Sequence, residues 1–492
     1  MQDTADNSSK SVLLNTFVVK KKRCRVYFHR GTLIWETERP PYMRFHLKIE
    51  SKLVILTIMT TNIYASLNVA MPAFCCVIGA GSVAVQTNEI IASGMTYRPR
   101  KVMLFVNPIG GKKKGLKIWE KDVQPLMTIA GIETKMMITE RAGHIRETLL
   151  TADLSDLHAI VCIGGDGTFA EVFNGLVLRA AKEQQIDPDD PEARLPSPTL
   201  PVGVIPSGST DTVAYSLHGI VLFTYVCTTD VQTAAIHIIF GDTTGLDLSS
   251  VHSNRSLLRL YASVLSYGYL GDVIRDSEKF RWMGPQRYDY SGFKKIIANK
   301  GYEGEIQLLS DPCHPAASTR CMKNCSRCLQ HMHNSVPDKE ISRWLTVQGK
   351  FFMVNGANVS CACSRSPMGF SPHCHIGDGC VDIILVRHTS FINNIRMLLR
   401  LSSKQKTLYD LPFVEVYRAR EFTFRALPTL HLQTENNVQR SQKTSGLSVW
   451  NCDGEVIENS NVKIRVHCQL LSVYTRRAQD SVADSSSCFC SI

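Results

Sequence analysis

The sequence predicts an α/β domain with a parallel sheet, followed by an antiparallel β-sandwich domain and preceded by a partial, β-rich N-terminus. Between residues 101 and 205, apolar runs of strand length alternate with segments of helical spacing, which is typical of a parallel sheet covered by helices. After about residue 245, short extended runs separated by turn residues dominate, which favours an antiparallel sandwich. Residues 11–36 form extended runs joined by a turn at His29-Arg30-Gly31.

The composition is that of a folded protein with a sizeable core. Of 492 residues, 44% are apolar and 20% are charged, which excludes a wholly disordered, collagen-like or coiled-coil protein. The net charge is +11, a modest excess that fits an anionic partner such as an acidic membrane surface or a phosphorylated ligand. Because the basic residues are not interleaved with aromatic ones in a recognisable module, we expect no nucleic-acid partner. The polar residues 1–10 lack an apolar signal region, so the 17 cysteines are expected to be reduced and intracellular.

The N-terminal region is expected to divide near residue 40. Residues 1–40 carry the β-rich pattern, whereas residues 41–97 include a stretch, 53–88, without a charged residue. Its length makes it a candidate membrane span, but its polar residues fit a buried or interfacial segment equally well. Residues 79–84 match a dinucleotide-binding G-x-G-x-x-A pattern, yet the acidic residue expected about 20 residues later is missing. We therefore expect no nicotinamide or flavin site.

Two further domains follow, at residues 98–248 and 249–477, and a disordered Ser-rich tail at 478–492. In the α/β domain the predicted strands are 102–106, 135–138, 159–163 and 201–205, and the predicted helices are 116–130, 146–154 and 169–181. In the sandwich the predicted strands lie within 257–265, 305–309, 351–354, 381–386, 413–417, 422–424 and 462–471.

The strongest chemical signal is the pentapeptide Gly164-Gly165-Asp166-Gly167-Thr168, which follows the third strand and opens a helix. Glycines let the backbone approach a ligand closely, and a helix N-terminus favours phosphate. A carboxylate beside a phosphate is repelled unless it binds Mg²⁺ or accepts a hydroxyl proton, and both roles belong to phosphoryl transfer. A tight turn with a helix-capping aspartate is the structural alternative.

Two more loops at strand ends support a phosphate site. Residues 107–115, beginning NPIGG and rich in lysine, follow the first strand, and residues 206–211, PSGSTD, follow the fourth. The first loop is not a Walker A motif, because Leu116 stands where lysine is required. Open α/β sheets bind ligands at the carboxyl ends of their strands, so the three loops together predict a nucleotide-binding domain.

These three motifs, in this order, resemble the catalytic domain of the diacylglycerol and sphingoid lipid kinases. Further matches are residues 267–272, 276–282, 287–289 and 451–455, and the resemblance covers about residues 99–477. It is strongest to the members that phosphorylate ceramide. Those members begin with a pleckstrin-homology domain, which residues 11–36 resemble faintly and residues 41–95 do not. The apolar octet 220–227 interrupts a loop that is shorter in the family.

The resemblance implies an ATP- and Mg²⁺-dependent lipid kinase that phosphorylates the primary hydroxyl of ceramide to give ceramide 1-phosphate. Diacylglycerol or sphingosine as acceptor, or a catalytically dead membrane-associated homologue, are the alternatives. The implied partners are ceramide in membranes and an anionic membrane surface, and the implied location is cytoplasmic, peripheral on intracellular or plasma membranes. The oligomeric state is not implied.

The resemblance also assigns roles to residues. Asp166 is expected to be the general base that takes the proton of the lipid hydroxyl, and Asp272 to contact the ceramide headgroup. For Arg281 and Arg287 an ion pair with Asp276 or Asp289 is the alternative, and for Asp453-Gly454-Glu455 a hairpin turn. The residues expected to contact ATP are Asn107, Pro108, Ile109, Gly110, Gly111, Thr139, Gly164, Gly165, Gly167, Thr168, Glu171, Ser209, Thr210, Arg281, Arg287, Asp453, Gly454 and Glu455.

Cys321, Cys325 and Cys328 have the spacing of metal ligands. A tetrahedral zinc site needs four ligands, and Cys361 or Cys363 could complete it. A redox-sensitive or merely buried thiol cluster is an equal alternative, and Ca²⁺ is a further candidate ion.

Overall fold

The computed structural model of the chain describes the backbone of four N-terminal strands and then residues 98–111, 113–218, 231–284, 286–311, 343–363, 366–403, 406–427 and 446–475. The uncharged stretch 53–88, the octet 220–227, the cysteines 321–328 and the tail 478–492 lie outside the described residues. Within the described part, no helix combines the length and the apolar character needed to cross a membrane.

The N-terminal strands form a separate antiparallel sheet in the order β1-β2-β3-β4. They are β1 (Val12–Val19), β2 (Lys22–His29), β3 (Thr32–Thr37) and β4 (Arg44–Lys48). The extended pattern predicted for residues 11–36 is confirmed, and β4 continues the sheet beyond residue 40. That this sheet belongs to a pleckstrin-homology domain stays a prediction.

The predicted parallel sheet is confirmed, with the order β8-β7-β5-β6. Its strands are β5 (Lys101–Val106), β6 (Glu133–Ile138), β7 (Ala159–Gly164) and β8 (Val202–Pro206). The helices around it are α4 (His144–Thr151), α5 (Asp166–Glu183), α6 (Thr212–His218) and α7 (Val231–Phe240). Strands β5, β7 and β8 are almost wholly buried, which explains their continuous apolar sequences.

The helix predicted at 116–130 is divided into three pieces. They are α2 (Gly115–Ile118), a π-helical turn η3 (Trp119–Val123) and α3 (Gln124–Ile129). Pro125 stands in the first turn of α3. Since proline has no N–H to donate to the preceding turn, the hydrogen-bond pattern changes there, and the periodicity of the apolar residues could not reveal it.

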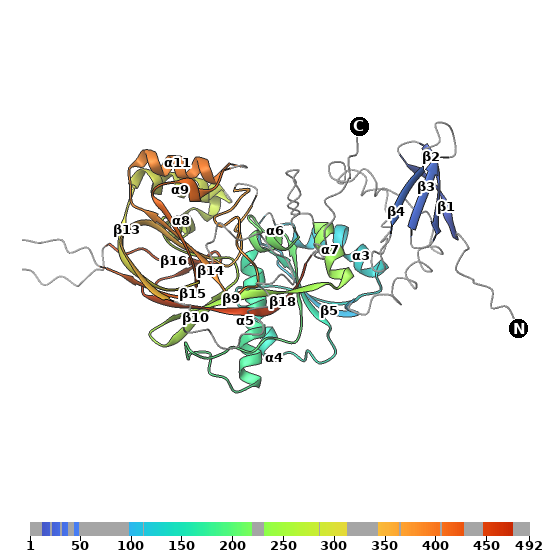
Figure 1. The fold of residues 1–492 in the computed structure, drawn as a ribbon. Coiled ribbons are helices and arrows are strands. Elements are labelled where there is room, and N and C mark those ends of the chain that lie inside the picture. The colour runs from blue at the N-terminus through green and yellow to red at the C-terminus, as the bar shows by residue number, and fades with distance from the viewer. Residues whose placement is uncertain are drawn as a thin grey trace, which may run out of the picture.

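The antiparallel region is continuous with the parallel sheet (Figure 1). Strand β18 (Val462–Tyr474) pairs with β9 (Thr243–Ser253) and β15 (Val414–Ala426), and its Val473 lies parallel to Val202 of β8. Strand β9 thus crosses the boundary predicted at residue 248. The other strands are β10 (Ser256–Tyr261), β11 (Val264–Gly268), β12 (Tyr302–Ser310), β13 (Arg343–Ala357), β14 (Val381–Arg387), β16 (Trp450–Cys452) and β17 (Glu455–Ile457).

Helices also occur in this region, and the sequence analysis did not predict them. They are α8 (Tyr269–Ser277), η4 (Glu278–Met283), α9 (Gln286–Ala298), α11 (Phe391–Leu401) and η6 (Leu408–Asp410). Figure 1 shows α8, α9 and α11 gathered at one end of the antiparallel region, away from α4 and α5.

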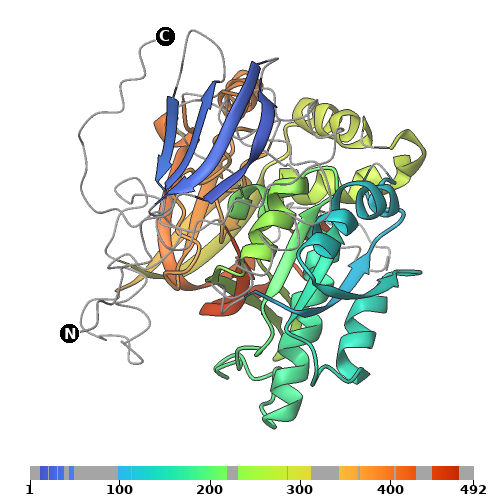
Figure 2. The same ribbon diagram turned by 90° about the vertical axis from the view of Figure 1, so that its right-hand side faces the viewer.

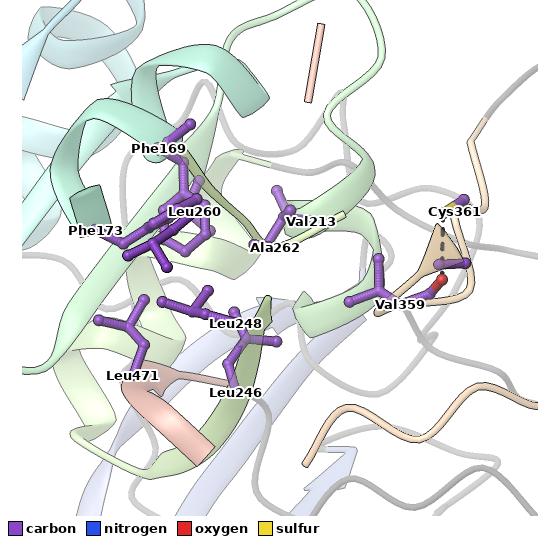
Figure 3. Close-up of a cluster of buried hydrophobic side chains, with 14 of the residues drawn as sticks. Phe169, Phe173, Val213, Leu246, Leu248, Leu260, Ala262, Val359, Cys361 and Leu471 are labelled. Carbon is purple, nitrogen blue, oxygen red and sulfur yellow. Dashed lines mark hydrogen bonds between the residues drawn. The ribbon is translucent and has the colours of Figure 1, made fainter. Parts of the chain in front are cut away.

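One hydrophobic core joins the two halves of the chain (Figure 3). Phe169 and Phe173 of α5 make an edge-to-face pair with ring centroids 5.2 Å apart. They belong to the same buried cluster as Leu246 and Leu248 of β9 and Leu471 of β18. This core holds the start of α5 against the antiparallel region. Figure 2 shows the same arrangement from the side, with the parallel sheet and its helices facing the viewer.

Candidate active site

Asn107 ties the first glycine-rich loop to the start of helix α5. Its Oδ1 accepts hydrogen bonds from the amides of Ile109 (3.1 Å) and Gly110 (2.9 Å), and its Nδ2 donates to Thr168 Oγ1 (3.0 Å). The side chain of Asn107 therefore shapes the loop and fixes it to the neighbouring strand end. Ile109 itself is 70% exposed.

The three glycine-rich loops approach one another backbone to backbone. Gly111 has φ +54°, and a Cβ there would lie 2.5 Å from the carbonyl oxygen of Ser207. A Cβ on Gly208 would lie 2.6 Å from Gly165 Cα. Only glycine permits these approaches. At Gly167, in contrast, a Cβ would meet nothing within 4 Å, so the first turn of α5 is open to a ligand.

Asp166 is held by the helix that follows the third loop. Its two carboxylate oxygens accept hydrogen bonds from the amides of Thr212 and Val213, each at 3.0 Å, at the start of α6. Burial raises the pKa of Asp166, and the two amides act in the opposite direction. Asp166 therefore caps a helix, as the structural alternative expected, and that helix is α6. Each oxygen keeps a second lone pair, so the same carboxylate can still accept a proton.

Asp453 enters the same site from the antiparallel region. Asp453 and Gly454 form the two-residue turn between β16 and β17, both with positive φ, 47° and 93°, as a type I′ hairpin requires. The Asp453 carboxylate accepts hydrogen bonds from three successive amides, those of residues 262, 263 and 264, at 2.8–3.0 Å. Burial and, less strongly, the charge of Asp166 raise its pKa to about 6. The hairpin thus places a second carboxylate within electrostatic reach of Asp166.

The neighbours of Asp453 in the turn have other contacts. Glu455 forms a two-point ion pair with Arg259, one contact being 2.8 Å between Nη2 and Oε1. The amide of Gly454 donates to Asn451 Oδ1 at 2.9 Å. Of the three residues predicted here, Asp453 is the one brought to Asp166.

Several other predicted contacts lie around the loops. Glu171 accepts hydrogen bonds from the amides of Gly143 (3.0 Å) and Ile145 (3.2 Å), so it caps helix α4. Thr139 follows β6, and its amide donates to Val106 O at 2.9 Å. Ser209 and Thr210 are exposed at the tip of the third loop.

Arg281 and Arg287 both contact Glu278. Arg281 Nε lies 2.6 Å from Glu278 Oε2, and Arg287 Nη1 lies 3.1 Å from Glu278 Oε1. Asp276, one of the two partners considered from the sequence, instead pairs with Lys279 and Lys294. The two guanidinium groups are thus gathered around one carboxylate.

Asp272 lies on α8 and is buried. It accepts hydrogen bonds from Arg275 (3.0 Å), Ser448 Oγ (2.8 Å) and the Tyr302 hydroxyl. These contacts join α8 to β12 and to the segment before β16. A lipid group that contacts Asp272 therefore has to share it with these three donors.

Ser207 and Asp211 belong to the third glycine-rich loop, and no individual role was predicted for either residue. Ser207 Oγ is buried without a hydrogen-bond partner among the described residues, at the point where the three loops meet. Asp211 Oδ1 accepts a hydrogen bond from the amide of Gly208 at 2.8 Å and so shapes the third loop. An unpaired buried hydroxyl among backbone amides fits a phosphate oxygen as its missing partner.

The described cysteines form no metal site. Cys361 is buried, and its thiol contacts the carbonyl oxygens of Val359 (3.2 Å) and Ser263 (3.7 Å). Burial raises its pKa well above the usual value. Within the described ranges no group of three His, Cys, Asp or Glu side chains could hold a metal ion. The zinc and calcium hypotheses thus gain no support.

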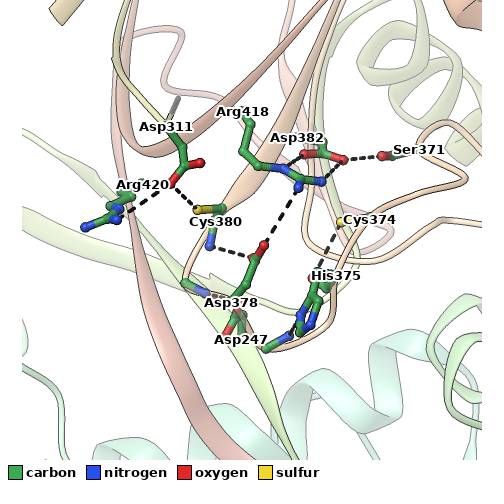
Figure 4. Close-up of polar contacts among 12 residues, drawn as sticks. Asp247, Asp311, Ser371, Cys374, His375, Asp378, Cys380, Asp382, Arg418 and Arg420 are labelled. Atoms are coloured by element: carbon green, nitrogen blue, oxygen red, sulfur yellow. Dashed lines mark hydrogen bonds and ion pairs between the residues drawn. The ribbon is translucent and has the colours of Figure 1, made fainter. Parts of the chain in front are cut away.

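A second buried polar cluster stabilises the antiparallel region (Figure 4). Arg418 of β15 pairs with Asp382 of β14 (2.7 Å) and with Asp378 (3.8 Å). Asp247 of β9 accepts hydrogen bonds from the amides of Gly379 and Gln469, both at 2.7 Å. Burial, reinforced by the charge of Asp378, raises the pKa of Asp247 well above its usual value. The carboxylates of Asp247, Asp378 and Asp382 are therefore engaged in contacts that stabilise the antiparallel region.

Glycine-rich loops at the ends of parallel strands, with a buried aspartate at the start of the following helix, fit a nucleotide-binding enzyme, and the family models show it to be an ATP-dependent lipid kinase of the diacylglycerol kinase type. The family model described as the diacylglycerol kinase catalytic domain matches residues 101–251, and the one described as the ceramide kinase C-terminal domain matches residues 263–491. The chain belongs to the ceramide kinase family.

Curated relatives agree with the family models. Ceramide kinase of Mus musculus is 39% identical over 80% of this chain and 78% of its own length, and that of Homo sapiens is 38% identical over 81% and 77%. The ceramide kinase-like protein of Homo sapiens is 30% identical over 78% and 70%. A crystal structure of a diacylglycerol kinase from Bacillus anthracis str. Sterne covers 77% of this chain and 98% of that chain, with a TM-score of 0.46 and 14% identity.

Proposed function

We propose that this chain transfers the γ-phosphate of ATP to the primary hydroxyl of ceramide, giving ceramide 1-phosphate. The observation that carries the proposal is the close approach of the three glycine-rich loops beside Asp166, whose charge acts on the buried Asp453, in a chain 39% identical to a ceramide kinase. ATP lies with its phosphates against the loops that begin at Asn107, Gly164 and Ser207. Backbone amides and the N-terminus of α5 then supply the donors that phosphate oxygens need.

Asp166 is the general base in this proposal. Its raised pKa favours proton acceptance, because desolvation penalises the charged form. The amides of Thr212 and Val213 hold the carboxylate in one orientation, so its remaining lone pairs can face the lipid hydroxyl. The proton moves from that hydroxyl to Asp166 as the oxygen attacks the γ-phosphorus, and the bond from the γ-phosphorus to the oxygen that bridges it to the β-phosphate breaks, which releases ADP.

A buried carboxylate whose pKa is raised by the charge of another carboxylate, as that of Asp453 is by Asp166, suits a divalent cation, because a cation relieves their repulsion. Asp166 and Asp453 are therefore the residues that would hold Mg²⁺. When bound, Mg²⁺ neutralises negative charge on the phosphate oxygens. Three backbone amides fix the Asp453 carboxylate in place, so it would hold the cation without moving.

The substrate places the enzyme at a membrane. Ceramide is confined to bilayers, so the protein works as a peripheral enzyme on a cytoplasmic membrane face, and its net charge of +11 suits an anionic lipid surface. Asp272, shared with three donors, is the candidate contact for the ceramide headgroup.

A direct assay tests the proposal. Purified full-length protein is supplied with Mg²⁺ and radiolabelled ATP and with ceramide, diacylglycerol or sphingosine in detergent micelles. We expect phosphorylation of ceramide well above that of the other two lipids. Preferential labelling of diacylglycerol or sphingosine would reassign the acceptor, and no labelling of any lipid would indicate a catalytically dead homologue.

A further inference from the structure

We propose that the exposed faces of α9 and α11 form one docking surface for an anionic membrane. The inference rests on the proposed function, because it is the bilayer-confined substrate that makes a membrane contact necessary. We call this surface the helical face. Its six apolar members are Tyr290, Phe293, Ile297, Ile392, Ile395 and Leu399.

Helix α11 turns an apolar stripe outward. Ile392 is 74% exposed, Ile395 38% and Leu399 69%, while Asn394 and Met397 are fully buried. The exposed residues have the spacing i, i+3, i+7, so they lie on one side of the helix. In a surface helix the apolar stripe normally packs against the core. In α11 this stripe is exposed, and Asn394 occupies part of the buried side.

Helix α9 repeats the same spacing. Tyr290 is 48% exposed, Phe293 67% and Ile297 56%, whereas Ser291 and Ile296 are buried. Two neighbouring helices therefore expose apolar residues in matching rows. Single exposed apolar residues need no explanation, but contiguous groups mark a surface that another apolar phase covers.

The two helices are fixed side by side. Asn394 Nδ2 of α11 donates to Asn299 Oδ1, directly after α9, at 2.6 Å, and Asn299 Nδ2 donates to Thr389 O at 3.0 Å. Figure 1 shows α9 and α11 adjacent at the end of the antiparallel region. The two rows thus belong to one preformed surface.

The charges around the helical face indicate which kind of partner it binds. Helix α11 contains Arg396 and Arg400 and no acidic residue, and α9 contains three basic residues, Arg287, Lys294 and Lys295, against one acidic residue, Asp289. Arg396 is exposed between Ile395 and Leu399. Trp282 is 82% exposed in the neighbouring η4, and tryptophan favours the lipid headgroup region. Apolar rows with basic residues among them fit an anionic lipid surface.

The position of the helical face also suits delivery of a lipid. Helix α8, which carries Asp272, packs against α9. A lipid that leaves the bilayer beneath the helical face therefore enters next to the element that carries the candidate headgroup contact.

Vesicle sedimentation with the full-length protein tests the proposal. The probes are phosphatidylcholine vesicles with and without phosphatidylserine. The variant is the double substitution Ile392→Glu and Leu399→Glu, and the matched control adds the same two charges elsewhere, Met136→Glu and Trp344→Glu, at residues that are 42% and 52% exposed. We expect binding of the variant to phosphatidylserine vesicles to fall about 10- to 100-fold, because each apolar side chain transferred contributes up to about a tenfold factor. The control should bind like wild type.

Activity on short-chain ceramide in detergent micelles separates the two proposals. If the inference is right, the variant keeps its micellar activity and loses vesicle binding. The proposed function fails if the wild type phosphorylates no ceramide in micelles, and vesicle binding is then still measured. Unchanged vesicle binding by the variant, or no binding by the wild type, would overturn the docking surface. So would a wild-type dimer that the variant abolishes in lipid-free sedimentation velocity, because a second copy would then cover the face.

Discussion

The charge of Asp166 helps to raise the pKa of Asp453, although the two residues follow different strands of the sheet and are far apart in the sequence. Asp166 begins helix α5 and is held by the amides of α6, and Asp453 sits in the turn between β16 and β17. The core around Phe169 and Leu471 keeps the two regions together. A reaction that needs both carboxylates therefore depends on the packing between the two halves of the chain.

Replacement of Asp166 by asparagine should separate catalysis from folding. We expect turnover to fall at least about 100-fold, because loss of a general base typically costs 10²–10⁴-fold. Asparagine keeps one acceptor oxygen, so one of the two amides of α6 loses its partner, at a cost of about 1 kcal/mol. Asp247→Asn is the matched control, since Asp247 also accepts two backbone amides. Micellar activity of D166N within a few-fold of wild type would refute the assignment.

Asp453 should make stability depend on pH. Its pKa rises from 3.8 in the unfolded chain to about 6 in the fold, so the folded state binds the proton more tightly. Its contribution to stability is therefore fully present below about pH 4 and is lost as the pH rises through about 6, by on the order of 1–3 kcal/mol. We expect the difference in melting temperature between wild type and D453N to change in favour of the variant between about pH 4 and pH 6. A difference that is constant with pH would contradict the raised pKa.

Two glycine substitutions should differ in their effect on stability. Gly208→Ala brings a Cβ within 2.6 Å of Gly165 Cα, whereas Gly167→Ala meets nothing within 4 Å. We expect G208A to lower the melting temperature and abolish ATP binding, because the loops must separate. G167A should melt like wild type but bind ATP at least several-fold more weakly, as measured by calorimetry. Normal ATP binding by both variants would show that the nucleotide lies elsewhere.

Glu278→Gln tests whether Arg281 and Arg287 serve the nucleotide. The substitution removes the carboxylate that both arginines contact. If they bind phosphate, two freed guanidinium groups should lower the KM for ATP about two- to fivefold, an effect that salt weakens. Glu183→Gln, which adds the same unit of charge and frees Arg179 at the far end of α5, controls for the net charge of the protein. An unchanged KM with reduced thermal stability would assign the arginines a structural role.

Local sequence patterns sufficed for the parallel sheet and its three loops. Strands β5, β7 and β8 are buried on both faces, so their apolar runs are unbroken. The loops need glycine because their backbones approach one another closely, so they appear in the sequence as glycine-rich motifs. The helices α9 and α11 were missed because part of their apolar residues face outward, so the pattern does not report which side is buried.

The sequence by itself determined the order of the elements, the glycine-rich strand ends and the presence of Asp166, because these depend on residues that are close in the chain. Only the tertiary structure decided which predicted residues meet. Asp453 lies within the electrostatic influence of Asp166, whereas Glu455 pairs with Arg259, Glu171 caps α4, and Arg281 and Arg287 share Glu278. The reason is physical: a hydrogen bond or ion pair depends on distances of a few ångströms between segments far apart in the sequence, and only packing of the shared core sets those distances.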